Sequence, residues 1–356
     1  MTAGANVDGT RAVRKGEELD ARALAQFLGW DEVRVSQFPS GHSNLTYLVE
    51  GGAQGHTRQL VLRRPPFGAK SVGKTAHDMG REYRILSRLH AVYPPAPKPV
   101  AYTEDTAIIG APFYVMERIV GVILRRDPPA GLVPPQTARA LGEAFIDNLA
   151  TLHGLDYAAA GLGELGKPEG YIERQVRGWA ERYHKARTDD IPNMQFLEKW
   201  LIENMPKESG AALIHNDYKY DNLVLAADDL TRIIGVLDWE MSTVGDPLMD
   251  LGTALSYWVH ADDPPELQAV RMCATHLPGS LTRGELLSRY RERTGRDIPN
   301  IVFYYCFALF KSCGVVQQIY WRYKQGLTHD ERFGAMIHAV HALSATAVRA
   351  IDAGHI

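Results

Sequence analysis

The sequence lacks the features that mark secreted proteins, proteins with structural metal sites and nucleic-acid-binding proteins. Its 356 residues include only three cysteines, Cys273, Cys306 and Cys313, an odd number without a C-x-x-C pair. A disulfide framework and a zinc site are therefore not expected, and a reducing cytoplasm fits this composition best. Lysine and arginine (39) nearly balance aspartate and glutamate (42), so we expect no nucleic-acid or acidic-membrane partner.

Long hydrophobic runs are missing as well. The polar N-terminus has no apolar core of the kind found in signal peptides, so we expect residues 1–16 to form a flexible tail. The most apolar stretch, "IVFYYCFALF" at 301–310, stops at Lys311, whereas a membrane-spanning helix needs about 20 apolar residues. The pattern therefore predicts a buried core helix at 301–310.

The order of periodic patterns predicts a β-rich part followed by a helical part. Three extended segments, the last two joined by the Gly-rich "GGAQGH", precede a helical pattern at 77–93 and two more extended pieces. Beyond the loop "DPPAGLVPPQT" helical patterns dominate. The predicted fold class is α+β, with a small antiparallel sheet and one helix in an N-terminal lobe (17–118) and a larger, mainly helical C-terminal lobe (119–356).

The densest group of chemically active residues lies in "HNDYKYDN" and in the apolar strand pattern that follows it. Phosphoryl transfer needs a carboxylate that orients the attacking hydroxyl and oxygen ligands for Mg²⁺. Asp217 can supply the carboxylate, and Asn222 and Asp238 can hold the metal. Lys219 can neutralise the transferring phosphate, and we expect His215 to brace the loop rather than to transfer protons.

The pattern H-x-D-x-x-x-x-N, followed by D-W-E and G-D-P-x-x-D-L, resembles the aminoglycoside phosphotransferase and choline kinase superfamily. With "GHSNLTY", "VLRRPP" and "AHDMGREYRIL", the sequence most resembles the kinase-like domains associated with acyl-CoA dehydrogenases and their free-standing bacterial relatives. The resemblance covers about 33–257. It implies a two-lobed protein-kinase-like fold, ATP and Mg²⁺ as cofactors, and a small-molecule acceptor with a hydroxyl group. A hydroxyacyl compound and an aminoglycoside-like alcohol are the acceptors it suggests.

The resemblance also implies which residues bind the nucleotide phosphates. Ser43 and Asn44 lie in the expected nucleotide loop. Arg63 stands where kinases carry a strand lysine, and Glu82 matches the helix residue that pairs with it. Because side chains alternate along a strand, Arg63 and Arg64 point to opposite faces, and only one of them can face the nucleotide.

Four further positions have expected or open roles. The backbone of Glu117 and Ile119, in the segment that joins the lobes, would bind adenine. Asp250 would hold the catalytic loop through hydrogen bonds to backbone N–H groups. For Glu240 two interpretations stay open, contact with metal or substrate and a solvated position at the end of a strand.

A competing motif comes earlier in the chain, because "GAKSVGKT" at 68–75 matches the Walker A pattern and "IIGVLDWE" fits Walker B. A P-loop follows its strand directly and belongs to a βαβ unit with parallel strands. Here Pro65 and Pro66 intervene, and the preceding strand is one arm of a hairpin, so we interpret 68–75 as a connector. A P-loop NTPase remains the enzyme alternative. A nucleotide-binding pseudokinase, suggested by Arg63 in place of lysine, is the alternative without turnover.

Overall fold

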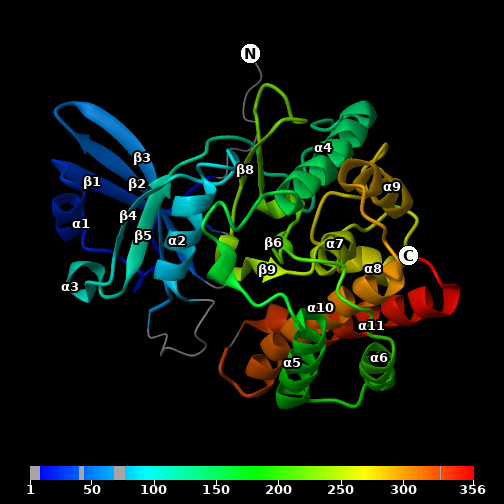
Figure 1. Ribbon diagram of the computed structural model, residues 1–356. Helices are drawn as coiled ribbons and strands as arrows, with labels where there is room; N and C mark the ends of the chain where they lie inside the picture. Colours follow the sequence, from blue (N-terminus) through cyan, green and yellow to red (C-terminus); the bar gives the residue numbers. More distant parts are fainter. Residues whose placement is uncertain (1–8, 40–43, 68–76, 329) are drawn as a thin grey trace. The chain divides into compact units, whose positions relative to one another are not determined.

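The computed structural model describes residues 9–39, 44–67, 77–328 and 330–356, which belong to two compact units (Figure 1). The N-terminal unit consists of Met1–Ile123 and Asn222–Met241, and the helical unit of Leu124–Asp221 and Ser242–Ile356. The chain therefore passes from one unit to the other more than once, unlike the single boundary near residue 118 that we expected. The segment Asn222–Met241, which carries both expected metal ligands, belongs with the N-terminal unit.

Alternating apolar residues build a five-stranded sheet in the N-terminal unit. The strands are β1 (Glu32–Gln37), β2 (Leu45–Ala53), β3 (His56–Arg64), β4 (Pro99–Thr103) and β5 (Phe113–Glu117). Their order is β1-β2-β3-β5-β4, and every neighbouring pair is antiparallel. On one face Tyr47, Leu60 and Leu62 pack with Leu24 of helix α1 (Ala21–Leu28) in a buried cluster. The predicted antiparallel sheet is confirmed, and β3 is not a strand of a parallel P-loop sheet.

Helix α2 (Met79–Leu89) carries the predicted partner of Arg63. The side chain of Asp78 caps the helix by accepting a hydrogen bond from the Arg81 N–H at 2.8 Å. The helix contacts β4 and β5, and Glu82 in its first turn is buried. The unit also contains a 3-10 turn at Trp239–Met241 and a hairpin of β7 (Leu223–Leu225) and β8 (Ile233–Val236).

The helical unit is built around one long apolar helix, α10 (Ile301–Lys324). Its buried residues 303–310 confirm the predicted core helix, and it packs against α11, α7 and α5. The main elements are α4 (Pro135–His153), α5 (Tyr171–Ala186), α6 (Pro192–Glu203), α7 (Pro247–Ser256), α8 (Pro265–Ala269), α9 (Arg283–Thr294), α11 (Met336–Ala353), β6 (Ala212–Ile214) and β9 (Thr243–Gly245). Among the described residues, none of these helices combines the length and apolarity that crossing a bilayer requires.

Helix α7 was not predicted, because "GDPLMDLG" is short and contains proline and glycine. Asp246 caps it by accepting from the Leu248 N–H at 2.8 Å, and Pro247 occupies the first helical turn, where its missing N–H costs nothing. Gly252 lets α7 approach α10 closely, since a Cβ there would lie 2.5 Å from the Tyr304 carbonyl oxygen. All residues of α7 are buried, and Asp250 of this helix contacts the loop after β6.

The first described residues are bound to the sheet rather than forming a flexible tail. Arg11 and Gln37 exchange two backbone hydrogen bonds of 2.9 Å, and the Arg14 N–H donates to the Gln37 side chain at 3.0 Å. This part of the chain therefore extends the edge of β1, in contrast to the expectation for residues 1–16. Residues 1–8 lie outside the described part of the chain.

Candidate active site

The loop that follows β6 is anchored by hydrogen bonds from its backbone to a buried carboxylate. The N–H groups of His215 and Asn216 donate to the two oxygens of Asp250, both at 2.7 Å, which confirms the hydrogen bonds predicted for Asp250. Asn216 has a left-handed backbone with φ 66°, a conformation that a short polar residue tolerates. The ring of His215 accepts a hydrogen bond from the Asp217 N–H at 3.2 Å, so His215 braces the loop as expected.

Asp250 is also paired on its other side. His153 lies 3.1 Å from one Asp250 oxygen through Nε2 and 2.7 Å from the Tyr290 hydroxyl through Nδ1, and all three residues are buried. Burial raises the pKa of Asp250, but His153, His215 and the backbone hydrogen bonds outweigh it, so the pKa lies below its usual value. The loop therefore rests on an ionised carboxylate whose two oxygens are both used.

Replacing this carboxylate is expected to reduce stability. In Asp250→Asn one oxygen becomes an NH₂ group that faces a backbone donor, so we expect a loss of about 2–4 kcal/mol in the free energy of unfolding. Because the pKa of Asp250 is lower in the folded protein, its contribution is present above the unfolded value of about 3.9 and is lost as the pH falls below it. Urea unfolding of the wild type, Asp250→Asn and the exposed control Asp352→Asn, from pH 7 to pH 3, measures the difference. A loss independent of pH would contradict the ionised state.

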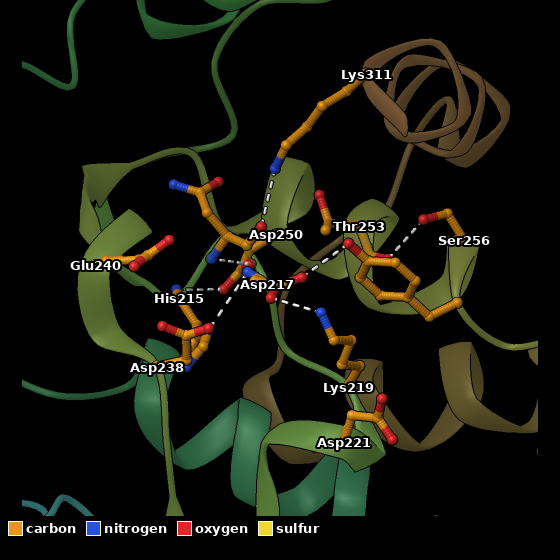
Figure 2. A network of polar contacts seen from close by, with 12 residues as sticks. His215, Asp217, Lys219, Asp221, Asp238, Glu240, Asp250, Thr253, Ser256 and Lys311 are labelled. Carbon is orange, nitrogen blue, oxygen red and sulfur yellow. Dashed lines mark hydrogen bonds and ion pairs between the residues drawn. The ribbon is translucent and has the colours of Figure 1, made fainter. Parts of the chain in front are cut away.

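The side chain of Asp217 is fixed at both oxygens (Figure 2). Lys219 Nζ lies 2.6 Å from Oδ2, and the Tyr257 hydroxyl donates to Oδ1 at 2.8 Å. Burial raises the pKa of Asp217, but Lys219, Tyr257 and His215 outweigh it and keep the pKa below its usual value. The structure thus provides an ionised, oriented carboxylate on a fixed loop, which is what an attacking hydroxyl needs as its hydrogen-bond acceptor.

Tyr257, at the end of α7, was not singled out from the sequence, and its hydroxyl has a testable role. Burial raises its pKa well above the usual value, and Asp217 raises it further, so the hydroxyl stays a donor at neutral pH. Tyr257→Phe should lower kcat by about tenfold, because a hydrogen bond to a charged group is lost.

The same substitution should move the acid limb of the kcat/KM profile to higher pH, since the pKa of Asp217 rises without that donor. Tyr305→Phe, another buried tyrosine, is the matched control. Unchanged kcat and pH profile in Tyr257→Phe would show that the hydroxyl only packs.

In the N-terminal unit, Arg63 is surrounded by carboxylates. Its Nη1 lies 2.5 Å from Glu82, and Nη2 lies 3.0 Å from Asp238 and 3.1 Å from Glu240. Loss of water would lower the pKa of Arg63, but Glu82, Asp238 and Glu240 raise it well above its usual value. The predicted pairing with Glu82 is confirmed. Arg64 instead donates to the Ile109 carbonyl at 2.7 Å, on the other face of β3 as predicted.

The β7–β8 hairpin brings Asn222 and Asp238 to the same end. Leu223 pairs with Val236, and the Leu237 N–H donates to the Asn222 carbonyl at 2.8 Å. Asp238 has φ 68°, so its side chain leaves the strand from a left-handed backbone, a feature often found at functional sites.

These two residues fit magnesium bound together with phosphate. Both offer the oxygen donors that Mg²⁺ prefers, and the Asp238 side chain is 34% exposed. Among the described residues, no group of three or more His, Cys, Asp or Glu could hold a metal alone. A nucleotide-bound magnesium ion needs only one or two protein ligands besides phosphate oxygens and water, so the donor set suits it.

Four expected nucleotide-binding positions stay predictions. The Asn44 side chain donates to Glu240 at 2.7 Å and lies 2.9 Å from His77, so it links the start of β2 to the Arg63 cluster. The Glu117 N–H donates to the Lys98 carbonyl at 2.8 Å, and Ile119 packs against Gly235. The adenine role of Glu117 and Ile119 is not tested by these contacts. Ser43 lies outside the described residues, as does the Walker-like segment 68–75.

Sequence reasoning missed two contacts and left a third open. Glu240 is buried against Arg63 and Asn44, which decides against a solvated position. Tyr257 carried no signal, because a lone tyrosine after a helix is unremarkable. Lys311 did carry one, as the single cation that interrupts an apolar helix, and its Nζ donates to the Asn216 carbonyl at 2.9 Å.

Comparison with known proteins explains why these groups occur in one chain. Residues 34–273 match the model of the phosphotransferase enzyme family. The acyl-CoA dehydrogenase family member 11 of Rattus norvegicus is 35% identical over 323 residues, which cover 88% of this chain and 40% of that protein. The chain therefore spans about two fifths of the length of the curated relatives it matches.

Solved structures agree with the family assignment. A candidate aminoglycoside phosphotransferase of Ralstonia eutropha is 29% identical, with a TM-score of 0.77 over 94% of this chain and 99% of that one. Two others, at 12% and 14% identity, share the fold. They are the GDP complex of aminoglycoside 2'-phosphotransferase-IIIa (TM-score 0.58, 91% and 97% covered) and choline kinase of Cryptosporidium parvum (0.55, 90% and 91% covered).

With its antiparallel sheet, its helical unit and its match over more than half of the sequence, the chain belongs to the phosphotransferase enzyme family.

Proposed function

We propose that this protein transfers the γ-phosphate of ATP to a hydroxyl group of a small molecule, with Mg²⁺ as the metal cofactor. The observation that carries the proposal is the carboxylate of Asp217, which Lys219 and Tyr257 hold ionised and oriented on a loop anchored by Asp250. A surface loop without catalytic function does not need a base with both oxygens fixed.

In the proposed reaction, Asp217 accepts a hydrogen bond from the acceptor hydroxyl and orients its oxygen toward the γ-phosphate. Its lowered pKa makes it a weak base, so it takes the proton late, as the new P–O bond forms. This timing suits a loose transition state, in which orientation matters more than early proton removal. Lys219 would offset the charge of the transferring phosphate.

The N-terminal unit would bind the nucleotide. Arg63, which Glu82 orients, would bind phosphate oxygens, and a guanidinium can bind two of them at once. Asn222 and Asp238 would hold Mg²⁺, which neutralises phosphate charge when bound. Residues 17–118 are thus proposed for nucleotide binding and residues 119–356 for catalysis and acceptor binding, with Asn222 and Asp238 as the exception to that division.

The acceptor is proposed at the level of chemical class. The acyl-CoA dehydrogenases among the relatives favour a hydroxyacyl compound, and the aminoglycoside phosphotransferases among the structural neighbours favour an amino sugar alcohol.

All three cysteines are buried free thiols, which agrees with the proposed cytoplasmic location.

Two substitutions, Arg63→Ala and Lys74→Ala, test the kinase mode of phosphate binding against the P-loop alternative. Arg63→Ala should raise the KM for ATP and lower turnover strongly, because the phosphate-binding cation is lost. Lys74→Ala should change both within about threefold, below about 0.7 kcal/mol, since the proposal gives Lys74 no phosphate contact. Steady-state kinetics on both variants decides the matter, with Arg63→Lys as the control that keeps a charge among the three carboxylates.

The opposite pattern, an inactive Lys74→Ala beside a normal Arg63→Ala, would favour the P-loop. If the wild type binds ATP yet phosphorylates none of a broad panel of alcohols, the pseudokinase alternative gains support.

A further inference from the structure

Lys311 reaches the catalytic loop from the apolar first half of helix α10. It follows ten apolar residues of α10, and its ammonium donates a hydrogen bond to the carbonyl oxygen of Asn216, the residue before Asp217. Figure 2 shows Lys219, which belongs to this loop, pointing toward Asp217, and Lys311 pointing toward the loop from a separate helix. Two cations from distant parts of the sequence therefore meet at the proposed base.

Only one of the two lysines is needed for Asp217. Lys219 already forms its ion pair at 2.6 Å, and the second oxygen of Asp217 is bound to Tyr257. Both oxygens of Asp250 are likewise used, by two backbone N–H groups and by His153. Among the described residues, no carboxylate forms an ion pair with Lys311, and its hydrogen bond to Asn216 uses one of three N–H donors.

Such a position is costly for an ammonium group. Lys311 is only partly exposed, and its pKa is lowered, chiefly by its loss of water, which Asp217 and Asp250 offset only in part. Lys219 and Arg182 lower the pKa further, because they add positive charge nearby. A neutral carbonyl repays little of the cost of desolvating a charge, so a brace for the loop does not by itself account for a lysine here.

We propose that Lys311 forms an anion-binding subsite beside Asp217 and that it selects acceptor alcohols carrying a carboxylate or another anionic group near the reacting hydroxyl. This inference rests on the proposed function, since it names the substrate class of the same site. The remaining N–H donors of Lys311 would form charge-assisted hydrogen bonds to the anionic group.

The charge balance argues against a cationic acceptor. Choline and the aminoglycosides, after which the structural neighbours are named, carry positive charge. In the helical unit of this chain, Lys219 and Lys311 lie beside Asp217, Arg182 adds positive charge near Lys311, and the carboxylates of Asp217 and Asp250 are already paired. An acceptor with an ammonium group near its hydroxyl would meet like charges, which costs free energy.

The test uses unbranched alcohols of three to six carbons that end in a carboxylate, in an amide or in an ammonium group. Ligand-observed NMR titration of the full chain with Mg²⁺ and a non-hydrolysable ATP analogue measures their affinities without requiring turnover. We expect the best carboxylate to bind wild type at least about tenfold more tightly than its amide. Lys311→Met should remove this preference and leave amide binding unchanged, and Lys311→Arg should retain part of it.

Lys324→Met, an exposed lysine of the same helix, serves as the matched control. Equal affinity of wild type for carboxylate and amide at every chain length would overturn the subsite. So would a Lys311→Met protein that melts at a lower temperature but keeps the carboxylate preference, because Lys311 would then be a structural brace.

A separate assay of phosphate transfer from ATP to the same alcohols tells the two proposals apart. Selective binding of carboxylates without any transfer would refute the phosphotransferase proposal for these alcohols and keep the subsite. Transfer that proceeds equally well to carboxylate and amide would support the phosphotransferase proposal and refute the subsite.

Discussion

Asp217→Asn is expected to lower kcat by about 10²–10⁴, which is the range for loss of a general base. The substitution keeps the shape of the side chain but removes its negative charge, so the amide cannot accept the proton of the acceptor hydroxyl. It also leaves Lys219 without its ion pair, which changes the charge at the loop. The affinity for nucleotide should change little, since the nucleotide-binding residues of the proposal lie in the other unit.

Single-turnover and steady-state kinetics, with nucleotide affinity measured by calorimetry, check this expectation. Asp228→Asn replaces an exposed carboxylate that pairs with Arg232 and should behave as wild type. Turnover within a few-fold of wild type in Asp217→Asn would remove the central residue of the proposed mechanism.

Asp238→Asn is expected to have the second large effect, on binding that depends on magnesium. Asparagine tolerates the left-handed backbone of residue 238, so the end of β8 should keep its geometry. Loss of an outer-shell partner of a metal typically lowers affinity by about 10–100-fold. Asp238→Asn removes a charged oxygen ligand itself, so affinity for Mg²⁺-ATP should fall by at least that much, and transfer should be abolished.

Binding of ATP without metal should be preserved or slightly stronger in Asp238→Asn, because one carboxylate no longer competes for Arg63. Glu82→Gln is the informative comparison, since Glu82 also binds Arg63 but is not expected to touch metal. It should weaken ATP binding to the same degree with and without Mg²⁺. Calorimetric titrations under both conditions separate the two patterns, and equal losses for Asp238→Asn would contradict its assignment as a metal ligand.

Local spacing in the sequence was enough to predict the chemical groups of the site and much of the fold. Asp217, Lys219 and Asn222 lie within six residues, and their pattern indicates phosphoryl transfer before any contact is known. The hairpin before Pro65 predicted the antiparallel sheet, because proline ends a strand and a Gly-rich connection reverses it. Alternation along the same strand predicted that Arg63 and Arg64 point to opposite faces, and the family resemblance selected Arg63 as the partner of Glu82.

Contacts between distant residues were decided by the tertiary structure alone. Tyr257 meets Asp217 across 40 residues of sequence, and Lys311 meets Asn216 across 95. Both contacts depend on α7 and α10, which pack closely at Gly252, and periodicity within one segment carries no information about such packing. The sequence alone therefore determined which groups can perform the chemistry. The packing of helices decided how the base is held and which surplus cation lies beside it, because burial and pairing of charges depend on neighbours that the local sequence does not specify.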